Sequence, residues 1–277
     1  MKREFVENKM KLASLIICAC LLSGAGVCAQ DIDGFGEDVN TSLATSKNSI
    51  KAALKDVTGK KPRAAVAGAT AAAFDADVPE ATQAQILNDL AFVRAIQGAT
   101  ASGLHRQIFG LVDGPTYGRF FDSRVKAIGM DDCGGGPSAI ACVIPFRDPA
   151  KMWLTQNYLK YNQPQISRLD TVFHEARHTE SEHHNWHHAL CPIPFKDENG
   201  NDVRGILSGR LMEGLNACDV TPFGSYGTGM IMLKNIQKFC SNCTDKVRMD
   251  AGIYGDDTCN RIIDPDAKKA IREDLYR

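Results

Sequence analysis

The sequence lacks any strong excess of charge of one sign. Its 277 residues include 32 Lys and Arg against 33 Asp and Glu, which gives a formal net charge of −1 at pH 7. A nucleic-acid-binding protein needs a basic stripe or patch, and the sequence has none, so we expect no nucleic-acid partner. The length suffices for one good-sized domain with a core of its own.

Long apolar runs are also lacking, except for one near the N-terminus. Residues 12–22 are apolar, Lys9 and Lys11 precede them, and Val27-Cys28-Ala29 follows. A basic start, an apolar middle and a small-x-small end are typical of a cleaved signal peptide. The alternative is a membrane anchor, for which the run is short. We therefore predict a signal peptide over residues 1–29, a secreted or periplasmic protein, and no membrane span after cleavage.

The cysteines that follow this segment do not form an even set. Seven of the ten cysteines lie beyond residue 29: Cys133, Cys142, Cys191, Cys218, Cys240, Cys243 and Cys259. In an oxidising compartment disulfides are the default. We predict a Cys133–Cys142 bridge across a Gly-rich turn and a Cys191–Cys218 bridge. Cys240 and Cys243 form a CxxC, which is also typical of redox or zinc half-sites, but a second CxxC is absent. One thiol must remain unpaired.

The order of predicted elements is helices, a few strands and then more helices, which indicates an α+β fold. Apolar residues at helical spacing predict a helix within residues 82–99, and β-branched runs predict strands at 124–128 and 139–144. Further helices are predicted at 148–159, from Pro164 through residue 178, and at 206–215, 230–239 and 267–275.

We divide the chain after the signal peptide into two parts. Residues 30–110 form an N-terminal helical and linker segment, with Ala-rich low complexity between residues 60 and 73. This segment is open to three interpretations: a propeptide, a spacer or a structural helical layer. Residues 111–277 contain the cysteines and the histidine cluster, and form the main domain.

The strongest motif is His174-Glu175-Ala176-Arg177-His178, which has the form HExxH. Residues four apart lie on one face of a helix, so the two imidazoles can bind one Zn²⁺ and the glutamate can reach a water bound to it. The apolar residues of this helix form a stripe about 160° from both histidines. They are Ile166, Leu169, Val172, Phe173 and Ala176. The helix can thus pack on a core and present both imidazoles to a cleft.

The motif is followed by more histidines, and it resembles that of the zincin metallopeptidases. Six of the seven histidines lie between residues 174 and 188. In the metzincin branch a third histidine ligand falls six residues after the second, as His184 does here, although Ser181 stands where that family has Gly. The resemblance implies a zincin-like fold, with a small mixed sheet and an active-site helix, and a zinc cofactor.

The third metal ligand has several candidates. We assign the metal site to His174, His178, His184 and His188. Other zincin branches take the ligand from further along: Glu213 resembles the gluzincin glutamate, and Asp219, followed by Tyr226-Gly227, is similar to the aspzincin arrangement. Asp219 can instead orient a ligand histidine. Two further candidates are His183 and His187.

These residues predict a zinc metallopeptidase with a peptide or protein substrate. Three protein ligands leave one zinc position for a water, whose pKa falls to about 7. Glu175 would take the proton of this water and pass it to the leaving amine, while an edge strand at 139–144 aligns the peptide. Tyr226 is a candidate oxyanion stabiliser. Two rival hypotheses are a non-catalytic His-rich metal-binding protein and an inactive zincin fold held by disulfides. Only hydrolysis requires Glu175.

Overall fold

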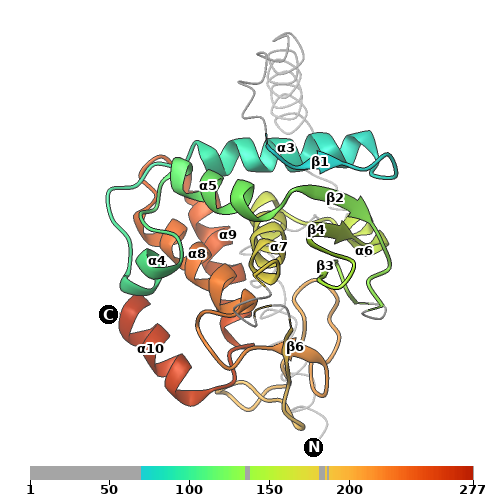
Figure 1. Ribbon diagram of the computed structural model, residues 1–277. Coiled ribbons are helices and arrows are strands. Elements are labelled where there is room, and N and C mark those ends of the chain that lie inside the picture. The colour runs from blue at the N-terminus through green and yellow to red at the C-terminus, as the bar shows by residue number, and fades with distance from the viewer. Residues whose placement is uncertain (1–69, 135–137, 181–184, 186, 277) are drawn as a thin grey trace, which may run out of the picture. The chain divides into compact units, whose positions relative to one another are not determined.

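The computed structural model describes residues 70–134, 138–180, 185 and 187–276 (Figure 1). The predicted signal peptide and residues 30–69 lie outside the described residues. The helices are α3 (Glu80–Arg94), α4 (Gly103–Ile108), α5 (Gly114–Arg124), α6 (Gln156–Lys160), α7 (Gln165–His178), α8 (Ser225–Phe239), α9 (Asp245–Cys259) and α10 (Pro265–Leu275). The strands are β1 (Ala73–Phe74), β2 (Ala127–Met130), β3 (Ala141–Ile144), β4 (Asp148–Leu154), β5 (Ala189–Leu190) and β6 (Asn216–Cys218). The predicted α+β class is confirmed.

The main sheet is small and mixed. Its strand order is β1-β2-β4-β3, and β5 and β6 form a separate antiparallel pair. The strands β1, β2 and β4 run parallel, with Ala127 opposite Lys151, whereas β3 pairs antiparallel to β4. Strand β3 therefore lies at the edge of the sheet and, among the described strands, pairs only with β4, the strand that follows it in the chain.

Helix α7 lies between the sheet and the helices α8 and α9 (Figure 1). It contacts α8, α9, α3, α5 and β3. The five residues of its predicted apolar stripe are almost completely buried in the main core: Ile166, Leu169, Val172, Phe173 and Ala176. The prediction of a core-facing stripe is confirmed, and the opposite side of α7 is left for polar residues.

The N-terminal part of the described chain shares this core. Ile86, Leu90 and Val93 of α3 pack in the same cluster as the apolar stripe of α7. A buried ion pair also joins the two helices, because Arg168 donates to both oxygens of Asp89 at 2.6 and 2.8 Å. Helix α3 thus packs against the histidine-bearing helix.

Two of the predicted helices are wrong. Residues 148–159 form strand β4 and then the short helix α6, because pairing on both sides buries Met152 and Trp153 in the sheet. A short apolar run fits a strand as well as a helix, and here tertiary pairing decides. Residues 206–215 form turns, since Gly209 and Gly214 adopt positive φ angles of 66° and 70° that interrupt a helix. Among the residues described, no helix combines the length and apolar character needed to cross a membrane.

Both predicted disulfides are present, and there is a third. The pairs are Cys133–Cys142, Cys191–Cys218 and Cys240–Cys243. The Cys191–Cys218 bond joins the region of β5 to β6, and the CxxC at the end of α8 is itself a disulfide. Among the cysteines of the described residues, Cys259 is the one without a disulfide, and it is partly buried. Three disulfides are typical of proteins from an oxidising compartment, while secretion itself stays a prediction.

Candidate metal centre

Three histidines converge at the C-terminal end of α7. The four-residue spacing places His174 and His178 on the same face of the helix, with their Nε2 atoms 3.1 Å apart. The Nε2 atom of His188 lies 3.1 Å from that of His174 and 3.0 Å from that of His178. These three nitrogen atoms form a group that can hold one metal ion.

The outer nitrogens of two of these histidines have their own partners. The Nδ1–H of His178 donates to the backbone carbonyl of Asn185 at 2.6 Å, and the hydroxyl of Ser225 lies 3.1 Å away. The Nδ1–H of His188 donates to Oδ1 of Asp219 at 3.0 Å. A proton on Nδ1 leaves the lone pair on Nε2, so these contacts leave both Nε2 atoms able to bind a metal ion.

Asp219 also connects the centre to α8. Its Oδ2 accepts the backbone N–H groups of Tyr226 at 2.8 Å and Gly227 at 3.4 Å, both in the first turn of that helix. The carboxylate is buried and is stabilised there by the unpaired N–H groups at the helix start. Asp219 is therefore a fixed acceptor that orients His188.

The histidine cluster is electrostatically suited to a cation. Burial lowers the pKa of His178 to about 3, and repulsion by His188 adds to this effect. Burial and the neighbouring histidines hold the pKa of His174 well below its usual range. The imidazoles of His174 and His178 are therefore neutral at physiological pH. Nitrogen ligands of a tetrahedral zinc lie about 3.3 Å from one another, close to the 3.0 to 3.1 Å separations here. The donor set fits a zinc ion.

Glu175 lies beside the three histidines and is only 4% exposed. Its Oε2 is buried and has no hydrogen-bond partner among the described residues. Burial raises the pKa of this carboxyl to about 8. A buried carboxyl without a partner is costly, and a nearby divalent cation would favour its charged form. The side chain is thus left available to a group in the cleft.

These side chains line a cleft of about 1000 Å³. One wall includes residues 138–143, which contain the edge strand β3, and another comes from residues 205–208 and 214–217. Tyr226 also lines the cleft, with its ring centre 4.4 Å from that of His174 and 4.5 Å from that of His188. Its hydroxyl accepts from Arg261 at 2.8 Å. The edge strand β3 and the three histidines therefore line the same cleft.

The structure brings together only some of the predicted ligands. His174, His178 and His188 meet, while His183 and His184 lie outside the described residues. His187 lines the cleft, whereas Glu213 is not among the described residues that do so. Asp219 bonds to His188, which is the orienting role considered above.

Sequence analysis missed the residues around this group. They are Asn185, Ser225 and, behind them, Glu180, Arg177 and Arg124. The sequence offered little signal for them, since Arg124 and Glu180 are far apart in the chain. Asn185, within the histidine-rich stretch, and Arg177, within the HExxH motif, lie next to the predicted ligands in the sequence.

Comparison of the chain with protein-family models, with curated proteins and with solved structures finds no match to any of them. The site must therefore be interpreted from its own geometry. Together, the fold and the site define an α+β protein with a three-histidine centre that can hold a metal ion.

Proposed function

We propose that the protein is a zinc-dependent hydrolase that cleaves peptide bonds outside the cytoplasm. The observation that carries this proposal is the position of Glu175. Its carboxyl is buried, has an oxygen without a partner among the described residues, and lines the same cleft as the three Nε2 atoms. A protein that only stores metal has no need of such a carboxyl.

The choice of zinc follows from the donor set. Imidazole nitrogens suit zinc, copper, iron and nickel, and zinc is the usual metal of a three-histidine site that leaves one position open. Such a site is typical of catalysis, because structural zinc sites are closed by four protein ligands. Bound between His174, His178 and His188, zinc would lower the pKa of a water and polarise the carbonyl to be attacked.

The residues of the chain then have distinct roles. Glu175 accepts the proton of the attacking water on its free oxygen and later delivers it to the leaving nitrogen. His188 stays oriented because Asp219 accepts its Nδ1–H. Tyr226 and Arg261, joined by a hydrogen bond of 2.8 Å, line the cleft beside the metal ligands and can stabilise negative charge on the substrate oxygen.

The edge strand β3 supports an extended peptide as the substrate. Ala141 and Val143 line the cleft, and their strand pairs with β4 on one side only. The main-chain groups on an open strand edge can pair with an added strand. A peptide in the cleft would thus lie along β3 and pass the histidines in an extended conformation.

Two variants of the mature protein test this proposal. Glu175→Gln should retain one zinc per chain but lose about 10²- to 10⁴-fold in peptide cleavage, because the amide cannot accept a proton. His178→Ala should lose both the metal and the activity, since it removes a ligand. Metal content is measured by elemental analysis and cleavage on a mixed peptide library.

Unchanged cleavage by Glu175→Gln would show that the motif is not the catalytic centre. A wild-type protein that binds zinc but cleaves nothing in the library would favour the rival hypothesis of a metal-sequestering protein.

A further inference from the structure

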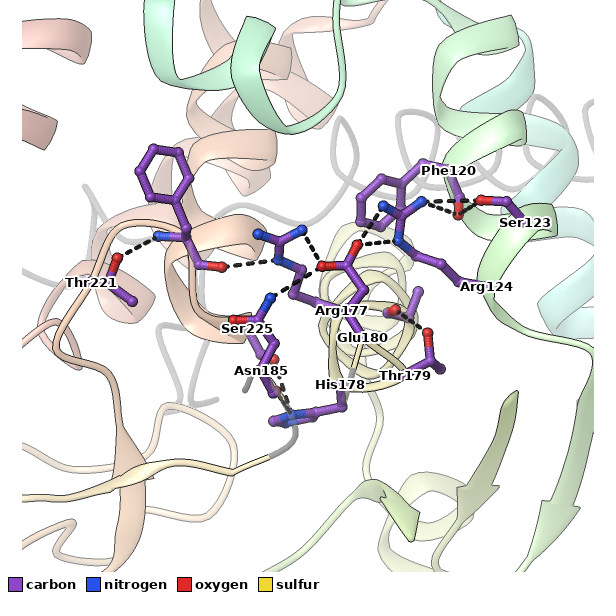
Figure 2. A network of polar contacts seen from close by, with 12 residues as sticks. Phe120, Ser123, Arg124, Arg177, His178, Thr179, Glu180, Asn185, Thr221 and Ser225 are labelled. Atoms are coloured by element: carbon purple, nitrogen blue, oxygen red, sulfur yellow. Dashed lines mark hydrogen bonds and ion pairs between the residues drawn. The ribbon is translucent and has the colours of Figure 1, made fainter. Parts of the chain in front are cut away.

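A buried carboxylate lies directly behind the metal centre. Glu180 follows the end of α7 and is 7% exposed. Two arginines bind it: Arg124, at the end of α5, donates from Nε to Oε1 at 2.6 Å, and Arg177 donates to Oε2 at 2.5 Å (Figure 2). Hydrogen bonds from two arginines to one carboxylate hold it in a single orientation.

A third partner leads from this carboxylate to a metal ligand. The side-chain amide of Asn185 donates to Oε2 of Glu180 at 3.1 Å, and the backbone N–H of Asn185 lies 3.4 Å from the carbonyl oxygen of Glu180. The carbonyl of Asn185 in turn accepts the Nδ1–H of His178 at 2.6 Å. Figure 2 shows Asn185 between Glu180 and the imidazole of His178.

We propose that Glu180 is a positioning residue of the metal centre. Through Asn185 it holds His178 in the orientation that turns Nε2 toward the ion, and it fixes the chain three residues before His188. The inference rests on the metal-binding part of the proposed function and is independent of hydrolysis.

The arginines connect Glu180 to rigid parts of the molecule. Arg124 also donates to the carbonyl of Phe120 at 3.1 Å and has its guanidinium 3.8 Å from the centre of the Phe120 ring. Arg177 donates from Nε to the carbonyl of Phe223 at 2.9 Å, in the segment between Asp219 and α8. The supports of His178 and of His188 therefore meet at the same arginine–carboxylate cluster.

The same helix offers a matched control. Arg168, in the first half of α7, forms an ion pair with Asp89 that is as buried as the Glu180 cluster, but lies at the other end of the helix. Breaking this pair destabilises α7 without touching the partners of any metal ligand. An Asp89→Asn variant thus separates a general loss of stability from a loss of positioning.

The experiment titrates cobalt(II) into the metal-free full-length mature protein and records its visible absorption bands, which report ligand geometry. Glu180→Gln and Asn185→Ala should each weaken cobalt binding about 10- to 100-fold and alter the bands. Asp89→Asn should lower the thermal midpoint but keep the dissociation constant within about twofold of wild type, because its site is remote. Asn185→Ala preserves the backbone carbonyl and removes only the contact with Glu180.

Wild-type affinity and bands in both Glu180→Gln and Asn185→Ala would overturn the inference, as would an equal weakening by Asp89→Asn. If Glu180→Gln does not fold, Asn185→Ala decides, since it leaves the carboxylate with both arginines. A wild type that binds no cobalt overturns the inference together with the metal site. If the wild-type protein binds cobalt but cleaves no peptide, only the hydrolase proposal is overturned. The cobalt affinities of the variants still support or overturn the role of Glu180.

Discussion

Two regions of the molecule contain buried histidines, and they differ in one respect. His105 is 0% exposed, its Nδ1–H donates to the carbonyl of Gly110 at 2.9 Å, and its Nε2 lies 2.8 Å from the hydroxyl of Tyr117. His178 and His188 use Nδ1 in the same way, but their Nε2 atoms face other Nε2 atoms. The difference lies in Nε2. The Nε2 of His105 faces a hydroxyl that can donate to it, whereas the Nε2 atoms at the metal centre face only one another.

This difference separates a structural histidine from a metal ligand. The tyrosine hydroxyl completes the hydrogen bonding of His105 without any added group. At the metal centre the Nε2 atoms of the three histidines face one another, and a cation or a bound proton donor there would satisfy all three. Burial alone does not distinguish the two regions, because it lowers the pKa of His105 to about 4 and that of His178 to about 3.

The largest expected effect is the loss of zinc binding when a ligand histidine is replaced, compared with replacement of the structural histidine. His188→Ala should weaken zinc binding by more than about 100-fold, beyond the usual cost of losing an orienting partner. His105→Gln should keep one zinc per chain. Elemental analysis after dialysis measures both. Loss of zinc from His105→Gln with its fold intact would show that the distinction is wrong.

The next effect concerns the segment that carries His188. Replacing Cys191 and Cys218 together with alanine should lower the free energy of unfolding by about 3 kcal/mol, because the bond closes a long loop in the unfolded chain. The same replacement of Cys240 and Cys243, which lie three residues apart, should cost less. Urea unfolding of the zinc-bound proteins measures both. Equal losses would argue against loop closure as the cause.

The pH dependence of stability sharpens the comparison further. The folded pKa of His105 is about 4 against an ordinary value of 6.5. As the pH falls below 6.5, His105 becomes protonated in the unfolded chain but stays neutral in the folded chain until about pH 4. The contribution of neutral His105 to the free energy of unfolding is therefore complete above pH 6.5 and is lost as the pH falls toward 4. From pH 7 to pH 5 wild type should lose about 2 kcal/mol more than His105→Gln. Identical pH profiles in urea unfolding would contradict the assignment.

The smallest expected effect tests the orienting role of Asp219. Asp219→Asn retains an oxygen that can accept the Nδ1–H of His188 but removes its charge, so zinc binding should weaken about tenfold. Competition with a chelator of known affinity measures the change. A loss as large as that of His188→Ala would indicate that Asp219 itself binds the metal.

The part of the site on α7 could be predicted because it is local. The positions of His174, Glu175 and His178 follow from the helical period, and so does the buried stripe on the opposite side. The place of His188 in the site could not be predicted, since it depends on a contact with Asp219, 31 residues further along the chain. The cluster around Glu180 was hidden for the same reason, because Arg124 precedes it by 56 residues.

Errors in the fold have a similar cause. The strand β4 contains a proline and a run of apolar residues that also fit a helix, and only its pairing with β2 and β3 makes it a strand. The turns at 206–215 follow from glycines whose positive φ angles no apolar pattern reveals. Helices that bury one face could be predicted from the period of their apolar residues. Strand β4 could not, because its conformation depends on pairing with distant segments of the chain.

The pairing of β1 with β2 limits how the chain can be trimmed by proteases. Ala73 and Phe74 add the outermost parallel strand to the sheet, and Ala72 is buried in the main core. A cut after residue 74 would remove this strand and expose the apolar residues under it. We therefore expect N-terminal processing that leaves the sheet intact to fall before residue 72, and sequencing the N-terminus of the mature protein would locate it.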